Sequence, residues 1–101
     1  MTPTLTFDRS AIASFCRAHG VTRLSLFGSA VSGQLRPESD IDVLVAFKLD
    51  RVPGFLELFA MEQELSQILG GRRVDLVTEK FLNPRIRAQV LMQAEVQYAE
   101  G

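Results

Sequence analysis

The sequence has no tryptophan and only one cysteine, one tyrosine and one histidine. Because Cys16 stands alone, the chain has no internal disulfide and no cysteine spacing that suits a metal, and its apolar helical setting predicts a buried, inert thiol. An excess of basic charge is also absent, since the net charge is −1. This argues against stable, direct binding of nucleic acid, which needs a basic surface. The arginines at positions 72, 73, 85 and 87 are expected to be solvated.

Long apolar runs are missing as well. No stretch approaches the roughly 20 residues that span a bilayer, and the first ten residues, MTPTLTFDRS, lack the pattern of a signal peptide. We therefore expect a cytoplasmic protein without membrane contacts. With 47% hydrophobic and 23% charged residues, the 101-residue chain is expected to form one globular domain over residues 1–101.

Apolar periodicity predicts that helices and strands alternate along the chain. Asp8 is expected to cap a helix over Arg9–His19 that stops at Gly20. The other expected elements are strands over 21–27, 40–47 and 74–78, a single helical turn over 29–33, and helices over 53–69 and 85–94. Residues 96–99 fit either a fraying helix or a short strand. This order predicts an α/β (α+β) fold in which helices flank a mixed sheet of three to four strands.

The helix expected to begin at Pro53 is predicted to bury one face. Apolar residues recur there at helical spacing, with Glu62 as the only polar residue among them, namely Phe55, Leu58, Phe59, Leu65 and Leu69. Leu91 and Met92 of the last helix are likewise expected in the core. The only histidine, His19, is expected to be largely exposed at the end of the first helix, and Tyr98 to be partly buried as an anchor for the tail.

The residues that can carry chemistry gather in residues 27–47, FGSAVSGQLRPESDIDVLVAF. Gly28-Ser29 ends one apolar run, and Asp40 and Asp42 stand at the head of the next. Alternation along a strand points both carboxylates to the same side. The turn at Gly28-Ser29 can present backbone N–H groups and a hydroxyl to an anion, although a plain strand-ending turn explains it equally well.

Asp75 is a second acid within an apolar strand. An unpaired charge in such a position costs stability, so a functional role would explain Asp42 and Asp75 better than a structural one. If their strands are neighbours, Asp40, Asp42 and Asp75 converge on one oxygen-rich surface that suits Mg²⁺. The alternative is that they are isolated structural acids, with Ser39-Asp40 at the end of a turn, where acids are common.

Taken together, these residues resemble those of the DNA polymerase β-like nucleotidyltransferases. The resemblance rests on three features: a Gly-Ser pair, an Asp-x-Asp motif that follows after ten residues, and a third Asp on a later strand. The phrases LFGSAVSG, ESDIDVLV and RRVDLVT are similar to those of the minimal nucleotidyltransferase (MNT) branch, and the likeness covers nearly the whole chain. One departure is that many relatives have an arginine soon after Gly-Ser, where this chain has Ala30-Val31-Ser32. Whether Arg36 replaces it stays open.

The resemblance implies a Mg²⁺-dependent transferase that uses ATP. By this likeness, Gly28 and Ser29 would hold the β- and γ-phosphates, and Asp40 and Asp42 would bind two Mg²⁺ ions. Asp75 would complete the second metal site and help to deprotonate the attacking hydroxyl. The chemistry agrees, since phosphoryl transfer depends on positioning and charge neutralisation.

The resemblance also implies a protein partner. MNT proteins are commonly antitoxins that transfer AMP from ATP to a tyrosine of a HEPN-domain ribonuclease toxin. Only about 25 residues follow the third strand, which leaves no second domain to grip an acceptor. Two alternatives remain: a non-catalytic antitoxin that neutralises its partner by binding, and a transferase that acts on a small-molecule hydroxyl and assembles as a homo-oligomer. Base preference and the number of nucleotides transferred are not encoded in any visible pattern.

Overall fold

The computed structural model describes residues 7–28, 40–79 and 82–100. Within these ranges the elements are α1 (Arg9–His19), β1 (Val21–Phe27), β2 (Ile41–Phe47), α3 (Phe55–Ile68), β3 (Val74–Thr78), α4 (Pro84–Gln93) and β4 (Glu95–Ala99). The predicted bounds of α1, β1 and β3 are confirmed, and those of β2 and α4 are confirmed to within one residue. The helical turn expected over 29–33 lies outside the described residues.

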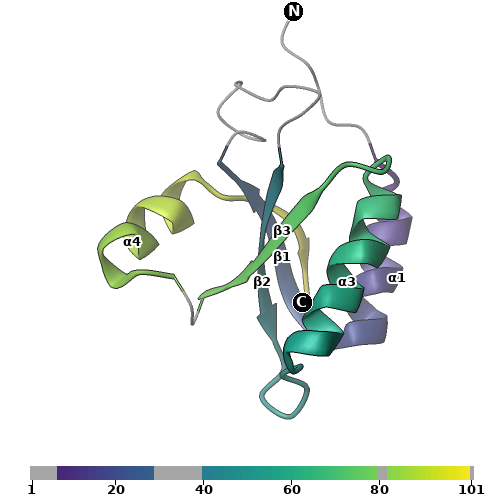
Figure 1. Cartoon of the computed structure of the whole chain (residues 1–101). Helices are drawn as coiled ribbons and strands as arrows, with labels where there is room; N and C mark the ends of the chain where they lie inside the picture. The colour runs from purple at the N-terminus through teal and green to yellow at the C-terminus, as the bar shows by residue number, and fades with distance from the viewer. Residues whose placement is uncertain (1–6, 29–39, 80–81, 101) are drawn as a thin grey trace, which may run out of the picture.

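The four described strands form one mixed sheet in the order β3-β2-β1-β4 (Figure 1). β1 pairs antiparallel with β2 and with β4, whereas β3 runs parallel to β2. The parallel pair requires a crossover, and α3 supplies it. The predicted α+β class with a mixed sheet is therefore confirmed. Residues 95–99 form a strand because they pair with β1, a long-range contact that their own sequence pattern does not reveal.

The hydrophobic core lies between one face of the sheet and the two helices α1 and α3, which lie side by side (Figure 1). α4 lies on the other side of the sheet. The core side chains of β2 are Ile41, Val43 and Val45, as the alternating pattern predicts. Cys16 is fully buried in this core, and burial raises the pKa of its thiol to about 12. The thiol therefore stays protonated and inert at neutral pH, which confirms the prediction. Tyr98 is partly buried and packs against the same core.

Side-chain contacts tie α1 to α3. Asp8 caps α1 by accepting a hydrogen bond from the Ser10 N–H at 2.8 Å, and Gly20 ends the helix with a φ of 71°. The prediction of a largely exposed His19 was wrong. Its side chain is 21% exposed, and its Nε2 lies 2.8 Å from Glu64 Oε2 of α3. The sequence could not show this contact because it joins residues from two separate helices.

The prediction for α3 was wrong in two respects. The helix begins at Phe55, after Gly54, rather than at Pro53. Phe55 and Phe59 are 82% and 61% exposed, and Leu91 and Met92 of α4 are 41% and 87% exposed, so none of these side chains belongs to the core. Leu58, Leu65 and Leu69 of the predicted face do pack in the core, where Met61 joins them. Phe55 and Phe59 lie beside this core stripe on the helix surface and stay exposed.

Glu62, the polar residue on the apolar side of α3, contacts the edge strand β3. Its Oε2 accepts a hydrogen bond from the Leu76 N–H at 2.8 Å. β3 has no strand on its outer side in the described ranges. An outward N–H on such an edge invites pairing with another chain unless something covers it. Glu62 therefore protects the edge and holds β3 against α3. No helix among the described residues has the length and apolar content that crossing a membrane requires.

The core stripe of α3 predicts that two substitutions in this helix lower the free energy of unfolding by very different amounts. Leu65 is fully buried, so Leu65→Ala should lower the free energy of unfolding by about 2–5 kcal/mol. Phe59→Ala removes a larger side chain but should cost less than about 1 kcal/mol, because Phe59 is 61% exposed. Thermal unfolding of both variants by circular dichroism measures the difference. Equal losses would contradict the assignment of Phe59 to the surface.

Candidate active site

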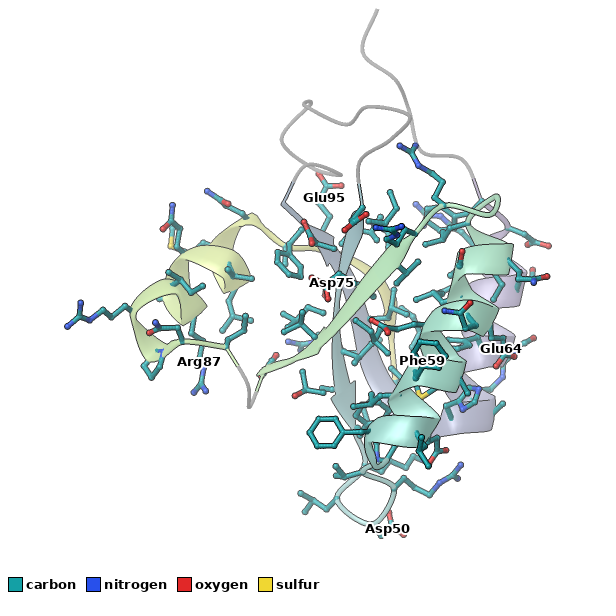
Figure 2. The ribbon with its side chains drawn as sticks, viewed as in Figure 1. Asp50, Phe59, Glu64, Asp75, Arg87 and Glu95 are labelled. Carbon is teal, nitrogen blue, oxygen red and sulfur yellow. The ribbon has the colours of Figure 1, made fainter. Side chains whose placement is uncertain are left out.

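The parallel pairing of β2 with β3 places two aspartates side by side. Asp42 of β2 is the register partner of Asp75 of β3. Both side chains leave the sheet on the face opposite to the core, because Val43 and Leu76, the next residues along each strand, point into the core. Asp42 is partly buried, whereas Asp75 is exposed on the edge strand (Figure 2). The structure thus brings together two of the three predicted acids on neighbouring strands.

The third predicted acid, Asp40, precedes β2 by one residue and is exposed. Its charge acts on Asp42. The pKa of the Asp42 carboxyl is raised above its usual range, first by burial, then by the negative charge of Asp75 and then by that of Asp40. The fold therefore holds Asp42 where its ionised form is disfavoured. A cation placed between these carboxylates would reverse that effect.

Gly28 lies directly against the Asp42 carboxylate. Phe27, at the end of β1, is the register partner of Asp42, so the next residue turns over the acid. Gly28 has a φ of +67°, and a Cβ at this position would lie 2.3 Å from Asp42 Oδ2. Both the left-handed backbone and the missing side chain are needed here. Gly28 therefore lets the turn approach the acid closely.

Ser29, the other predicted nucleotide-binding residue, lies outside the described residues, as does Arg36. Of the pair expected to bind phosphates, only Gly28 is described. Its place beside Asp42 agrees with the predicted triphosphate site next to the acids that are expected to bind metal. The hydroxyl expected from Ser29 stays a prediction.

The acids suit Mg²⁺ in their chemistry, although they do not form a complete ligand set by themselves. Within the described ranges, no group of three or more Asp, Glu, His or Cys side chains is arranged to hold a metal ion. Mg²⁺ usually binds one or two carboxylates and takes its other ligands from water and substrate phosphates. Asp42 with Asp75 or Asp40 fits that pattern. Burial and the two neighbouring carboxylates raise the pKa of Asp42, and a bound cation would offset this cost.

Two features of the site escaped the sequence analysis. The contact between Gly28 and Asp42 joins residues from different strands, and the only signal for it was a glycine directly after an apolar run. Glu62 was noticed as the single acid on an apolar helix face. Its role in holding the strand that carries Asp75 could not be inferred without knowing that β3 is an edge strand.

Comparison with known proteins places the chain in a family. Residues 9–96 match the family model described as a nucleotidyltransferase domain. The protein adenylyltransferase MntA of Thermococcus cleftensis is 38% identical over 74 residues, which cover 73% of this chain and 72% of MntA. MJ0435 of Methanocaldococcus jannaschii, assigned as a protein adenylyltransferase, is 36% identical over 76 residues, which cover 75% of this chain and 78% of that protein.

Solved structures give the same fold. A protein assigned as a minimal nucleotidyltransferase superposes with a TM-score of 0.71 at 43% identity, and the match covers 85% of each chain. A toxin–antitoxin complex crystallised with AMP-PNP gives a TM-score of 0.74 at 23% identity, over 91% of this chain and 73% of that one. A complex of the tri-AMPylated Shewanella oneidensis HEPN toxin with its MNT antitoxin gives a TM-score of 0.65 at 22% identity, over 90% of this chain and 69% of that one. These two likenesses support the fold alone. The matched residues, the identity to adenylyltransferases and the fold agree, and this chain belongs to the nucleotidyltransferase-domain family of minimal, MNT-like nucleotidyltransferases.

Proposed function

We propose that this protein is an antitoxin-type adenylyltransferase that transfers AMP from ATP to a tyrosine hydroxyl of a HEPN-domain toxin. The observation that carries the proposal is the pairing of Asp42 with Asp75 on neighbouring strands, with Gly28 against Asp42, in a chain of this family. Its relatives include a named protein adenylyltransferase, and one structural neighbour is an MNT antitoxin in complex with an AMPylated HEPN toxin.

The reaction is an in-line displacement at the α-phosphorus of ATP. The acceptor oxygen forms a bond to this phosphorus, the bond to the oxygen bridging the α- and β-phosphates breaks, and pyrophosphate leaves. Asp75, exposed on the edge strand, is suited to receive the hydroxyl proton, and Gly28 brings the backbone of its turn close to Asp42. When bound, two Mg²⁺ ions would neutralise the phosphates and stabilise the entering and leaving oxygens. Asp40, Asp42 and Asp75 are the residues that would hold them.

A second candidate is a non-catalytic antitoxin that neutralises its toxin by covering it. The exposed apolar side chains Leu56, Phe59 and Met92 favour this candidate, because they suit a protein interface. The two candidates differ in what neutralisation requires. Protein with both Asp40→Ala and Asp42→Ala should lose neutralisation if AMP transfer is needed and retain it if binding suffices.

Incubation of the protein with MgATP and its cognate HEPN-domain partner should increase the partner's mass by one or more AMP units. Asp42→Asn should reduce the transfer rate at least about a hundredfold, because an amide cannot neutralise the cation that the reaction needs. Intact-mass spectrometry measures the transfer, and Asp50→Asn, on the turn after β2, is the matched control that should behave as wild type. An unmodified partner in the wild-type reaction would contradict the proposal.

The raised pKa of Asp42 predicts a pH- and metal-dependent stability. The pKa of Asp42 is higher in the folded state than in the unfolded state, so the folded state binds the proton more tightly. The stability contributed by this group therefore falls as the pH rises from its unfolded pKa through its folded pKa. Asp42→Asn should therefore raise the melting temperature by a few degrees, roughly, at neutral pH without divalent cations. The gain should shrink as the pH falls toward about 4.

Mg²⁺ should remove the destabilisation that the ionised Asp42 carboxylate causes in the wild-type protein. Thermal shift measurements with and without millimolar Mg²⁺ should show stabilisation of the wild type and none of Asp42→Asn. Asp50→Asn again serves as the control that responds like wild type. If Mg²⁺ leaves the melting temperature of the wild type unchanged, the result would argue against a metal site at these acids.

A double-mutant cycle tests the contact between Gly28 and Asp42. Gly28→Ala should destabilise the protein by about 1–2 kcal/mol through its left-handed backbone, with a further cost from the 2.3 Å approach of its Cβ to Asp42 Oδ2. In an Asp42→Ala background the further cost should disappear, and only the backbone cost should remain. Urea unfolding of the four proteins gives the coupling energy. Additive effects would mean that the two residues do not touch.

A further inference from the structure

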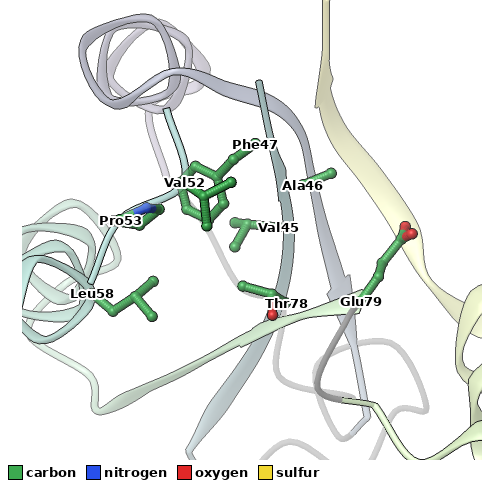
Figure 3. Close-up of a pocket in the computed structure, with 8 residues that line it drawn as sticks. All are labelled: Val45, Ala46, Phe47, Val52, Pro53, Leu58, Thr78 and Glu79. Atoms are coloured by element: carbon green, nitrogen blue, oxygen red, sulfur yellow. The ribbon is translucent and has the colours of Figure 1, made fainter. Parts of the chain in front are cut away.

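An apolar groove runs between α3 and the end of β3. It consists of two adjacent cavities of about 330 Å³ and about 350 Å³ that share Leu58 and Thr78, and we call it the α3–β3 groove. Figure 3 shows the first cavity, lined by Val45, Ala46, Phe47, Val52, Pro53, Leu58, Thr78 and Glu79. The second cavity is lined by Phe55, Leu58, Phe59, Glu62, Leu76, Val77 and Thr78.

Large apolar side chains are exposed along this groove. Val52, Phe55 and Phe59 line it and are 64%, 82% and 61% exposed. A soluble protein rarely leaves such a contiguous apolar surface open unless another molecule covers it. Aromatic side chains in particular tend to anchor protein interfaces.

Both charged residues that line the groove, Glu62 and Glu79, are acidic. α3 carries neither lysine nor arginine, and its other acids, Glu57 and Glu64, lie beside His19 of α1. The basic residue at the end of the groove is Arg87, whose Nη2 donates to the Glu79 carbonyl oxygen at 3.0 Å. Two copies of α3 would bring like charges together, which disfavours pairing of the groove with itself. The occupant that fits is apolar along its centre and carries lysine or arginine on its flanks.

The edge of β3 indicates which type of element binds. An added strand would need the outward N–H of Leu76, but this N–H already donates to Glu62 Oε2 at 2.8 Å. Strand addition would therefore break an existing contact. A helix needs no backbone hydrogen bonds from its groove and binds through side chains at helical spacing. The groove therefore suits an amphipathic helix.

The groove borders the strand that carries the proposed catalytic acid. Its β3 residues, Leu76, Val77 and Thr78, follow Asp75 directly on the same strand, and at about 3.3 Å per residue they lie within roughly 10 Å of it along the strand. The groove lies on the α3 side of the sheet, whereas Asp75 leaves the opposite face. Because β3 is an edge strand in the described ranges, a protein that binds around this edge would contact both the groove and the exposed Asp75.

From these observations we propose that the α3–β3 groove docks the acceptor protein, through a helix whose apolar face is flanked by lysine or arginine. The inference rests on the proposed function, since it assigns where the HEPN-domain acceptor binds. Phe59 is the anchor of the groove. Glu79 attracts the basic flank, and Glu62 keeps the edge closed to strands.

Binding of the cognate HEPN-domain protein, measured by calorimetry with no nucleotide present, tests the groove separately from catalysis. Phe59→Asp should weaken binding at least about thirtyfold, the loss typical of an interface anchor. Leu49→Asp is the matched control, because Leu49 is 99% exposed on the turn after β2 and does not line the groove. It should bind as wild type. Glu79→Lys should weaken binding severalfold, and added salt should reduce the difference between Glu79→Lys and wild type.

Two outcomes would overturn the groove assignment. The first is unchanged binding and AMP transfer by Phe59→Asp, which would leave the proposed function standing. The second is a homodimer of this chain that Phe59→Asp dissociates, observed by light scattering, because the occupant would then be a second copy. If the partner binds wild type but not Phe59→Asp and is never AMPylated, the groove assignment is supported and the proposed function fails. Melting temperatures near wild type for all variants exclude misfolding as the cause.

Discussion

The parallel register between β2 and β3 is the constraint on which the candidate site depends. It sets Asp42 opposite Asp75, and a slip of one residue would turn one of the two carboxylates into the core. The apolar side chains that alternate with the acids, Val43 and Leu76 among them, oppose such a slip because it would also expose them. α3 supports this register from outside the sheet, since Glu62 holds the Leu76 N–H on the outer edge of β3. One helix therefore fixes the position of the strand that carries Asp75.

The same register has an electrostatic cost. Partial burial, Asp75 and Asp40 together raise the pKa of Asp42, so the fold retains a carboxylate where an amide or an apolar residue would be more stable. Such a local conflict with stability is typical of a functional site. Gly28 shows the same feature in the backbone, because its left-handed turn places it against that carboxylate with no room for a side chain. The turn and the acid are therefore coupled, because a side chain at position 28 would displace the Asp42 carboxylate.

Much of this fold could be predicted from residue pattern, and the exceptions share one cause. The bounds of α1 and β3, the burial of Ile41, Val43 and Val45, and the common face of Asp75 and Val77 follow from local periodicity and capping residues. The exposure of Phe59, the pairing of His19 with Glu64 and the strand at 95–99 depend on neighbours distant in the sequence. At the site, periodicity placed Asp40 and Asp42 together, but only the strand order brings Asp75 beside them. The role expected for Ser29 remains a prediction, because that residue lies outside the described ranges.

The strand order also explains why the candidate site stays open at the edge of the sheet. β4 completes the sheet on the β1 side, so β3 remains at the opposite edge in the described chain, with Asp75 exposed on it. Had β4 added beside β3 instead, it would have covered the groove beside α3 and enclosed the acid. Glu62 closes this edge to strands while Phe59 leaves an apolar surface beside it. The edge of β3 therefore combines three features: a strand N–H that Glu62 already occupies, an apolar groove on the α3 side, and the exposed carboxylate of Asp75 on the other side.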